Sequence, residues 1–286
     1  MDIHFVHQRG TGPDPFPLIL THGWPSSFLE FSALIPLLTN PGAHGGDPAD
    51  AFDVVIPSLP GFGLSGRPRG RGMNEARIAV LWSRLITAGL GYKRFGAHGG
   101  DIGAKASQHL GAAQPERVAG VHLIQDADWG PTEGAYAFLQ ATKPQTLAVA
   151  LTDSPAGQLA WMAEKFRTWS DSGGDLLRSF PADALLTNAT LYWLTNTMGS
   201  SVRLYAEGDP GAAWGDPEPH VAVPAGFALV GWSGGPPPEE ADTRAFADVR
   251  RVTRTPRGGH FLAGEEPESL AEELRTFFRP LRASGG

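Results

Sequence analysis

The residues best suited to chemistry lie in a glycine-rich stretch around one carboxylate, His98-Gly99-Gly100-Asp101-Ile102-Gly103. A short strand candidate (residues 94–97) precedes this stretch, and a helix candidate (residues 104–113) follows it. This order predicts a nucleophile elbow, a sharp strand-to-helix turn that lifts one side chain above the sheet. The Asp101 carboxylate could there attack an electrophilic carbon. Taken alone, an Asp between glycines is equally typical of an ordinary turn or a helix N-cap.

Two other loops carry residue types that complement a nucleophile. His22-Gly23-Trp24-Pro25 follows one buried-strand candidate, and Pro256-Arg257-Gly258-Gly259-His260-Phe261 follows the last one. The backbone N–H groups of Trp24 and Ile102 could hold an oxyanion, and His260 could act as a general base. Each loop alone is typical of turn chemistry, and a lone His is typical of a surface residue. All three follow strand candidates, so their order along the chain favours a single catalytic site.

The elements that must position these loops follow an alternating pattern. Helix candidates alternate with buried-strand candidates, which predicts an α/β fold with a mostly parallel, doubly wound sheet. Between residues 131 and 219 helical patterns dominate, which predicts a helical lid. We therefore expect a core of residues 1–128 and 220–286 and a lid of residues 129–219. The strand candidates are residues 2–7, 18–21, 53–56, 94–97, 118–124, 227–230 and 249–253, and the helix candidates are 28–38, 74–90, 104–113, 136–141, 158–169, 185–198 and 267–278.

Composition limits the classes of function. The chain has 286 residues, a formal net charge of −7 and no basic cluster with interleaved aromatic residues, which argues against nucleic acid as a partner. The absence of cysteine excludes disulfides and thiolate metal sites. No long apolar run marks a signal peptide or a membrane span, so we expect a cytoplasmic protein without a membrane partner. The sequence leaves a homodimer open.

Four motifs together carry a resemblance to a known family. With these motifs the chain resembles α/β-hydrolases of the epoxide hydrolase family, and it is most similar to the microsomal and juvenile-hormone branch and its bacterial relatives. The resemblance extends into the lid at residues 142–147, 151–155 and 199–205. Family members carry an N-terminal meander, which we expect this chain to lack. The motifs are His22-Gly23-Trp24-Pro25, Pro57-Ser58-Leu59-Pro60-Gly61-Phe62-Gly63-Leu64-Ser65-Gly66, Gly99-Gly100-Asp101-Ile102-Gly103 and Pro256-Arg257-Gly258-Gly259-His260-Phe261.

The resemblance implies hydrolysis of an epoxide to a vicinal diol in two steps, without a metal or a cofactor. Asp101 would attack an epoxide carbon and form an ester, while Tyr136 and Tyr205 would donate a proton to the epoxide oxygen. His260 would then activate water to cleave the ester. The oxyanion would form on Asp101 itself, held by the N–H groups of Trp24 and Ile102.

One expected residue is missing from its usual place. The family usually has a carboxylate that orients the His at about the position of Ser233, where this chain has none. Some α/β-hydrolases place that acid after the strand that follows the nucleophile helix, and Asp126 stands there. We hypothesise that Asp126 orients His260, with Asp128 as second choice; an ordinary loop Asp is the alternative interpretation. Glu239 and Glu240 are further candidates.

Two other functions remain open. A haloalkane dehalogenase would share the Asp nucleophile and the His base, but many relatives have a Trp after the nucleophile, and this chain has Ile102. A catalytically degenerate binding protein is the second alternative, although it would not need Asp101, His260 and both tyrosines together. The lid aromatic residues predict a bulky apolar or aromatic epoxide as the small-molecule substrate, with water as co-substrate. Those aromatic residues are Phe138, Trp161, Trp169, Tyr192 and Trp193.

Overall fold

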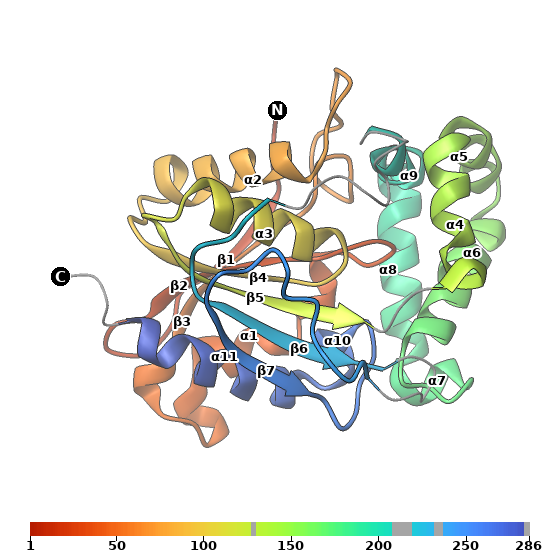
Figure 1. Ribbon diagram of the computed structural model, residues 1–286. Helices are drawn as coiled ribbons and strands as arrows, with labels where there is room; N and C mark the ends of the chain where they lie inside the picture. The colour runs from red at the N-terminus through yellow and green to blue at the C-terminus, as the bar shows by residue number, and fades with distance from the viewer. Residues whose placement is uncertain (127–129, 208–218, 232–236, 283–286) are drawn as a thin grey trace.

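The computed structural model describes residues 1–126, 130–207, 219–231 and 237–282. In these residues seven strands form one sheet with the order β1-β3-β2-β4-β5-β6-β7 (Figure 1). β1 pairs antiparallel with β3, and all other neighbours are parallel. The prediction of a mostly parallel α/β sheet is thus confirmed. The strands are β1 (Phe5–Gln8), β2 (Phe16–Thr21), β3 (Phe52–Pro57), β4 (Phe95–Gly99), β5 (Val118–Asp126), β6 (Ala225–Val230) and β7 (Val249–Arg254).

Helices cover both faces of the sheet, so its central strands are buried on both sides. α2 (Glu75–Arg84) and α3 (Ile102–Ala113) lie on one face, and α1 (Leu34–Thr39) and α11 (Pro267–Arg282) lie on the other (Figure 1). Every residue of β3, β4 and β6 is buried. Continuous apolar runs such as Leu18-Ile19-Leu20 are therefore suited to this sheet, because neither face meets water.

Two predicted core helices are not continuous α-helices. The expected helix 28–38 is instead a 3₁₀ turn, η1 (Phe28–Phe31), followed by α1. Pro36 falls in the first turn of α1, where a residue without an N–H loses no helical hydrogen bond. The expected helix 74–90 is α2, which continues into one π-helical turn, η4 (Leu85–Gly89).

Helices α4–α9, which we call the lid, follow β5 and lie beyond the carboxyl end of the sheet (Figure 1). The expected helix 185–198 is α8, which begins at Ala182 and ends at Thr195, because Asn196 takes a left-handed conformation (φ 52°); α9 begins at Met198. The division at residues 128, 129 and 219 stays a prediction, because residues 127–129 and 208–218 lie outside the described residues. The lid helices are α4 (Gly130–Thr142), α5 (Pro144–Asp153), α6 (Pro155–Trp169), α7 (Leu176–Ser179), α8 (Ala182–Thr195) and α9 (Met198–Glu207).

The lid is fastened to the sheet next to the Trp24 loop. The Tyr192 hydroxyl donates to the Ser26 carbonyl at 2.6 Å, and the Asn188 amide donates to the Pro25 carbonyl at 2.9 Å. Both side chains come from α8 and are buried, so these hydrogen bonds are shielded from water. None of the described helices has the length and apolar character that a bilayer crossing requires.

Candidate active site

Asp101 stands at the turn between β4 and α3. Its backbone has φ 54° and ψ −128°, a conformation that costs a residue other than glycine about 1–3 kcal/mol. The turn brings its carboxylate against the Trp24 loop so closely that a Cβ atom at Gly23 would lie 2.4 Å from Asp101 Oδ1. The sequence-predicted elbow therefore depends on a glycine in another loop as well as on its own glycines.

Two backbone N–H groups contact the Asp101 carboxylate. Trp24 N donates to Asp101 Oδ1 at 3.0 Å, and the N–H of Ile102 also donates to this carboxylate. Burial raises the pKa of Asp101 above its usual value, while the charge on His260 and these two N–H groups oppose that rise. The donors expected for an oxyanion thus already bind the side chain on which the oxyanion would form.

His22 shapes the Trp24 loop without taking part in proton transfer. Leu59 N donates to His22 Nε2 at 3.2 Å, so Nδ1 carries the proton and donates to the Gly23 carbonyl at 2.9 Å. Burial lowers the pKa of His22 to about 4, which keeps the ring neutral at pH 7. A neutral ring in this tautomer satisfies both backbone groups.

His260 lies between two carboxylates in the loop after β7. Its Nδ1 is 2.8 Å from Asp126 Oδ2, and its Nε2 is 3.8 Å from Asp101 Oδ2. Burial alone would lower the pKa of His260, but the hydrogen bond and charge of Asp126 and the charges of Asp101 and Glu30 raise it to about 9. In the resting site at pH 7 the ring is therefore an imidazolium held by two carboxylates.

Asp126, at the end of β5, is the hypothesised orienting acid that the structure brings next to His260. Among the described residues, no other candidate for the orienting acid is seen next to His260. Glu239 and Glu240 are exposed, and neither makes an ion pair with His260 within the described residues. Asp128 and Ser233 lie outside the described residues.

Tyr136 on α4 and Tyr205 on α9 meet above the Trp24 ring. Their hydroxyl oxygens are 3.4 Å apart. The Tyr136 ring stacks on Trp24 with centroids 5.5 Å apart, and the Tyr205 ring meets Trp24 edge-on at 6.1 Å. Burial raises the pKa of both phenols well above the usual value, and the charge of Asp101 adds to the rise. Both hydroxyls therefore keep their protons at neutral pH and can donate them.

Aromatic residues do not all line this site as the sequence predicted. Phe138 is 52% exposed on the outer side of α4, so its assignment to the substrate cavity is wrong. Tyr192 is fully buried and its hydroxyl is committed to Ser26, which gives it a packing role. Trp169 does contact His260, with ring centroids 5.3 Å apart, and the Trp161 indole N–H donates to Gln140 at 3.2 Å.

Two charged residues near the site escaped sequence analysis. Burial raises the pKa of Glu30 to about 7, and its charge acts on both His260 and Asp101. The Lys165 ammonium lies 5.2 Å from the centre of the Tyr136 ring. No local signal marks either residue, because each reaches the site through the packing of η1 or α6 rather than through a motif.

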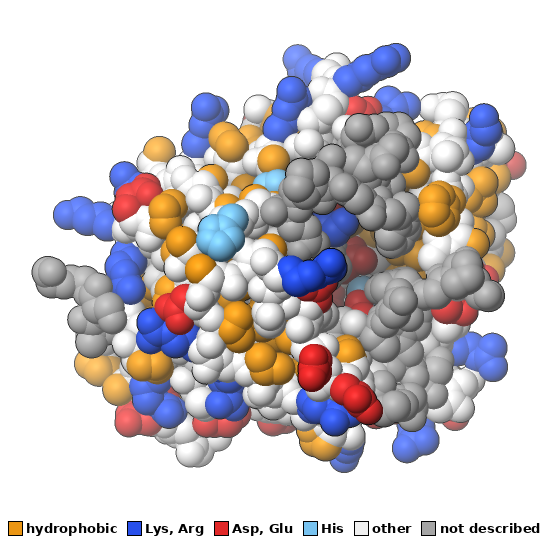
Figure 2. Space-filling view, in the orientation of Figure 1, with side chains coloured by type: hydrophobic (Ala, Val, Ile, Leu, Met, Phe, Trp, Pro, Cys, Tyr) orange, Lys and Arg blue, Asp and Glu red, His pale blue; other side chains and the backbone are white. Residues whose placement is uncertain are grey.

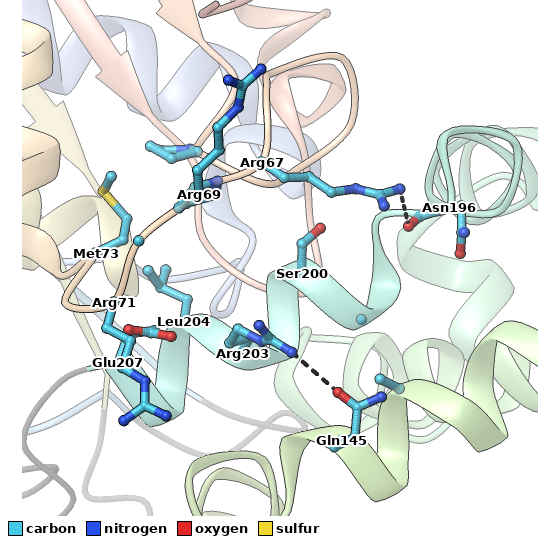
Figure 3. A pocket seen from close by; sticks show the side chains of 15 residues that line it. Arg67, Arg69, Arg71, Met73, Gln145, Asn196, Ser200, Arg203, Leu204 and Glu207 are labelled. Carbon is cyan, nitrogen blue, oxygen red and sulfur yellow. Dashed lines mark hydrogen bonds between the residues drawn. The ribbon is translucent and has the colours of Figure 1, made fainter. Parts of the chain in front are cut away.

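The site is distinct from a cavity elsewhere on the molecule. A cavity of about 420 Å³ lies between the loop of residues 67–73 and helices α5 and α9 (Figure 3). Arg67, Arg69, Arg71 and Arg203 line it, and none of the predicted catalytic residues does. In Figure 2 the surface is hollowed beside the lid, and acidic and His side chains are visible in the hollow. No cluster of three or more His, Asp or Glu side chains suited to a metal ion occurs among the described residues.

Comparisons with known proteins agree with this arrangement. Residues 17–202 match the family model for the alpha/beta hydrolase fold, and residues 1–31 match the model for the epoxide hydrolase N terminus. A putative epoxide hydrolase of Stigmatella aurantiaca is 40% identical over 306 residues, which cover 99% of this chain and 69% of the relative. The chain belongs to the epoxide hydrolase family.

Other relatives of this epoxide hydrolase family member include mammalian and juvenile hormone epoxide hydrolases, in agreement with the branch that the motifs predicted. Epoxide hydrolase 1 of Oryctolagus cuniculus is 35% identical over 97% of this chain and 72% of its own length. The crystal structure of juvenile hormone epoxide hydrolase from the silkworm Bombyx mori superposes with a TM-score of 0.83 at 31% identity, covering 99% of this chain and 74% of that chain. An Aspergillus niger epoxide hydrolase has a TM-score of 0.82 at 27% identity, covering 98% and 76%. The chain is therefore a hydrolase with the α/β-hydrolase fold.

Proposed function

We propose that this hydrolase opens an epoxide to a vicinal diol through an ester on Asp101 that His260-activated water cleaves. One observation carries the proposal. A buried carboxylate with two backbone N–H donors lies 3.8 Å from a His whose other nitrogen is 2.8 Å from Asp126. This is the nucleophile, base and orienting acid that covalent hydrolysis requires.

The first step forms the ester and opens the ring. Oδ1 of Asp101 accepts the Trp24 N–H and Oδ2 lies 3.8 Å from His260 Nε2, so we assign Oδ2 as the oxygen that attacks an epoxide carbon. The carbon–oxygen bond of the ring then breaks and the oxygen gains negative charge. The side chains of Tyr136 and Tyr205 are neutral phenols whose hydroxyl oxygens are 3.4 Å apart, and one of them donates the proton that this oxygen takes up. An alkoxide is much more basic than a phenolate, so this proton transfer is favourable.

The second step cleaves the ester, and the first step prepares its base. Esterification removes the negative charge of Asp101, which is one of the charges that hold the pKa of His260 at about 9. The pKa of the ring therefore falls when the ester forms. The ring gives up its proton, which restores through solvent the phenol that was ionised in the first step, and the neutral His260 can then take a proton from water. The new hydroxide attacks Cγ of Asp101, and Oδ1 becomes the oxyanion, to which the Trp24 N–H donates. When this intermediate collapses, the bond between Cγ and Oδ2 breaks, the leaving diol oxygen takes the proton that His260 holds, and the Asp101 carboxylate is restored.

The substrate we propose is a small apolar or aromatic epoxide. The support is the aromatic wall above Asp101, in which Trp24 contacts Tyr136, Tyr205 and Trp169. Such a wall buries apolar substrate surface and leaves the phenols as the polar groups that fix its orientation. A cytoplasmic location and a homodimer stay predictions of the sequence.

A single-turnover experiment in ¹⁸O-water tests the proposal. With enzyme in excess over styrene oxide, the ester route delivers an unlabelled oxygen of Asp101 to the first diol and leaves ¹⁸O in Asp101, which mass spectrometry of the peptide detects. Direct attack by water would label the diol at once and would refute the ester. Asp101→Asn should abolish turnover, and a 1-haloalkane offered as a parallel substrate distinguishes dehalogenation.

A further inference from the structure

The loop that carries His260 is fastened to the lid, not only to the sheet. His260 N donates to the Trp169 carbonyl at 2.9 Å, and Gly258 N donates to Asp171 Oδ2 at 3.2 Å. The two segments are so close that a Cβ atom at Gly259 would lie 2.5 Å from the Trp169 carbonyl oxygen. The position of the base is therefore tied to the segment that follows α6.

Glu265, the last residue of α10 (Leu262–Glu265), joins these two segments through its carboxylate. Oε1 accepts the N–H groups of Gly259 and Phe261, at 3.1 and 3.2 Å, which flank His260 on either side. Oε2 accepts the N–H of Asp171 in the lid segment at 2.6 Å. One carboxylate thus receives three backbone hydrogen bonds, two from the loop of the base and one from the lid.

The half-buried Glu265 carboxylate faces backbone N–H groups, unlike that of its neighbour Glu266. Burial raises the pKa of Glu265 to about 7, while the N–H groups of Asp171, Gly259 and Phe261 favour its charged form. Its neighbour Glu266 instead pairs with Arg257, whose side chain is 73% exposed. The two adjacent acids therefore have different roles. Glu265 lies inside the contact between the His260 loop and the segment after α6, which we call the joint, and Glu266 pairs with a surface arginine.

The joint lies directly beside the reacting groups. The Trp169 ring contacts the His260 ring at 5.3 Å and the Tyr136 ring at 4.9 Å between centroids. Displacement of the loop by a few tenths of an ångström would change the distance from His260 Nε2 to the ester carbon on which its water must act. The tyrosines are carried by α4 and α9, which Glu265 does not contact through any of these hydrogen bonds.

We propose that Glu265 is a positioning residue that locks the His260 loop to the lid, and that ester hydrolysis depends on this lock much more than ester formation does. The inference rests on the proposed two-step function. Ester formation requires Asp101 and the two tyrosines, whereas ester hydrolysis requires His260 to hold a water at the right place. A loosened loop consequently slows the second step.

The test compares Glu265→Gln with Glu266→Gln. The Gln side chain keeps one acceptor oxygen but presents an NH₂ group to either the loop or the lid, where only N–H donors face it. Rapid quenching and mass spectrometry measure both rate constants with styrene oxide. For Glu265→Gln we expect ester formation within about threefold of wild type and hydrolysis slowed at least about tenfold, so that the ester accumulates and kcat and KM fall together. Glu266→Gln should match wild type in both steps.

Each other outcome overturns the inference. Wild-type rates in Glu265→Gln show that the lock is not needed, and an equal fall of both steps shows a merely structural role. A wild-type enzyme that never forms an ester refutes the two-step function, and the inference with it. If Glu265→Gln does not fold, Asp171→Ala decides, because it removes the Gly258 hydrogen bond of the same joint and should also slow hydrolysis selectively.

Discussion

Replacing Asp126 with Asn should slow hydrolysis of the ester much more than its formation. The surrounding groups raise the pKa of His260 from 6.5 to about 9, which corresponds to about 3 kcal/mol in favour of the imidazolium. Asp126 contributes most of this effect, because it alone contacts the ring at 2.8 Å and keeps its charge once Asp101 is esterified. A share on the order of 2 kcal/mol predicts a loss of about thirtyfold in the step that charges the ring.

Loss of the correct tautomer can enlarge this effect. An Asn can present its NH₂ group to Nδ1, which leaves the ring proton on Nε2. Nε2 then cannot accept a proton from water. The same exchange in a Ser-His-Asp triad costs about 10⁴-fold in rate.

The pH dependence of ester hydrolysis has a definite sign. Without the Asp126 charge the pKa of His260 is lower, so the acid limb of ester hydrolysis should move to lower pH while the plateau falls.

The assay is a pre-steady-state measurement of ester decay between pH 5 and 9. Glu239→Gln is the matched control, because Glu239 is an exposed carboxylate that the sequence offered as a further candidate for the orienting acid. An unchanged plateau and acid limb in Asp126→Asn would refute the assignment, as would a loss that appears in Glu239→Gln instead.

Three further predictions concern other parts of the site. Tyr136→Phe and Tyr205→Phe should each slow ester formation about tenfold, because a second hydroxyl remains 3.4 Å away, and the double variant about 10³-fold, as stopped-flow burst rates can show. Gly23→Ala should abolish ester formation while circular dichroism stays native, since its Cβ atom would lie 2.4 Å from Asp101 Oδ1; a normal burst would contradict this. Neutral His22 contributes stability that is present above pH 6.5 and is lost as pH falls towards 4, so urea unfolding of His22→Gln should lack up to about 3 kcal/mol of the acid sensitivity of wild type.

Local patterns predicted most of the elements, but failed where tertiary contacts decide. Apolar runs marked the buried strands, because a parallel sheet covered on both faces needs no polar positions. The pattern of residues 185–198 predicted one helix, yet Asn196 ends it in a left-handed conformation that the apolar spacing does not reveal. The pattern also could not tell that Phe138 faces outwards, since either face of a lid helix can bear an aromatic residue.

The sequence by itself determined the residue types that could react and the loops that bear them. The glycines around Asp101 and His260 predict turns, because a turn is formed by residues within a few positions of one another. Only the tertiary structure decided which groups meet. Asp126 and His260 are 134 positions apart and make contact because β5, β6 and β7 are neighbours in the sheet. Glu30, Lys165 and Glu265 reach the site through packing of η1, α6 and α10, which depends on side-chain volume and burial across the whole fold rather than on any motif.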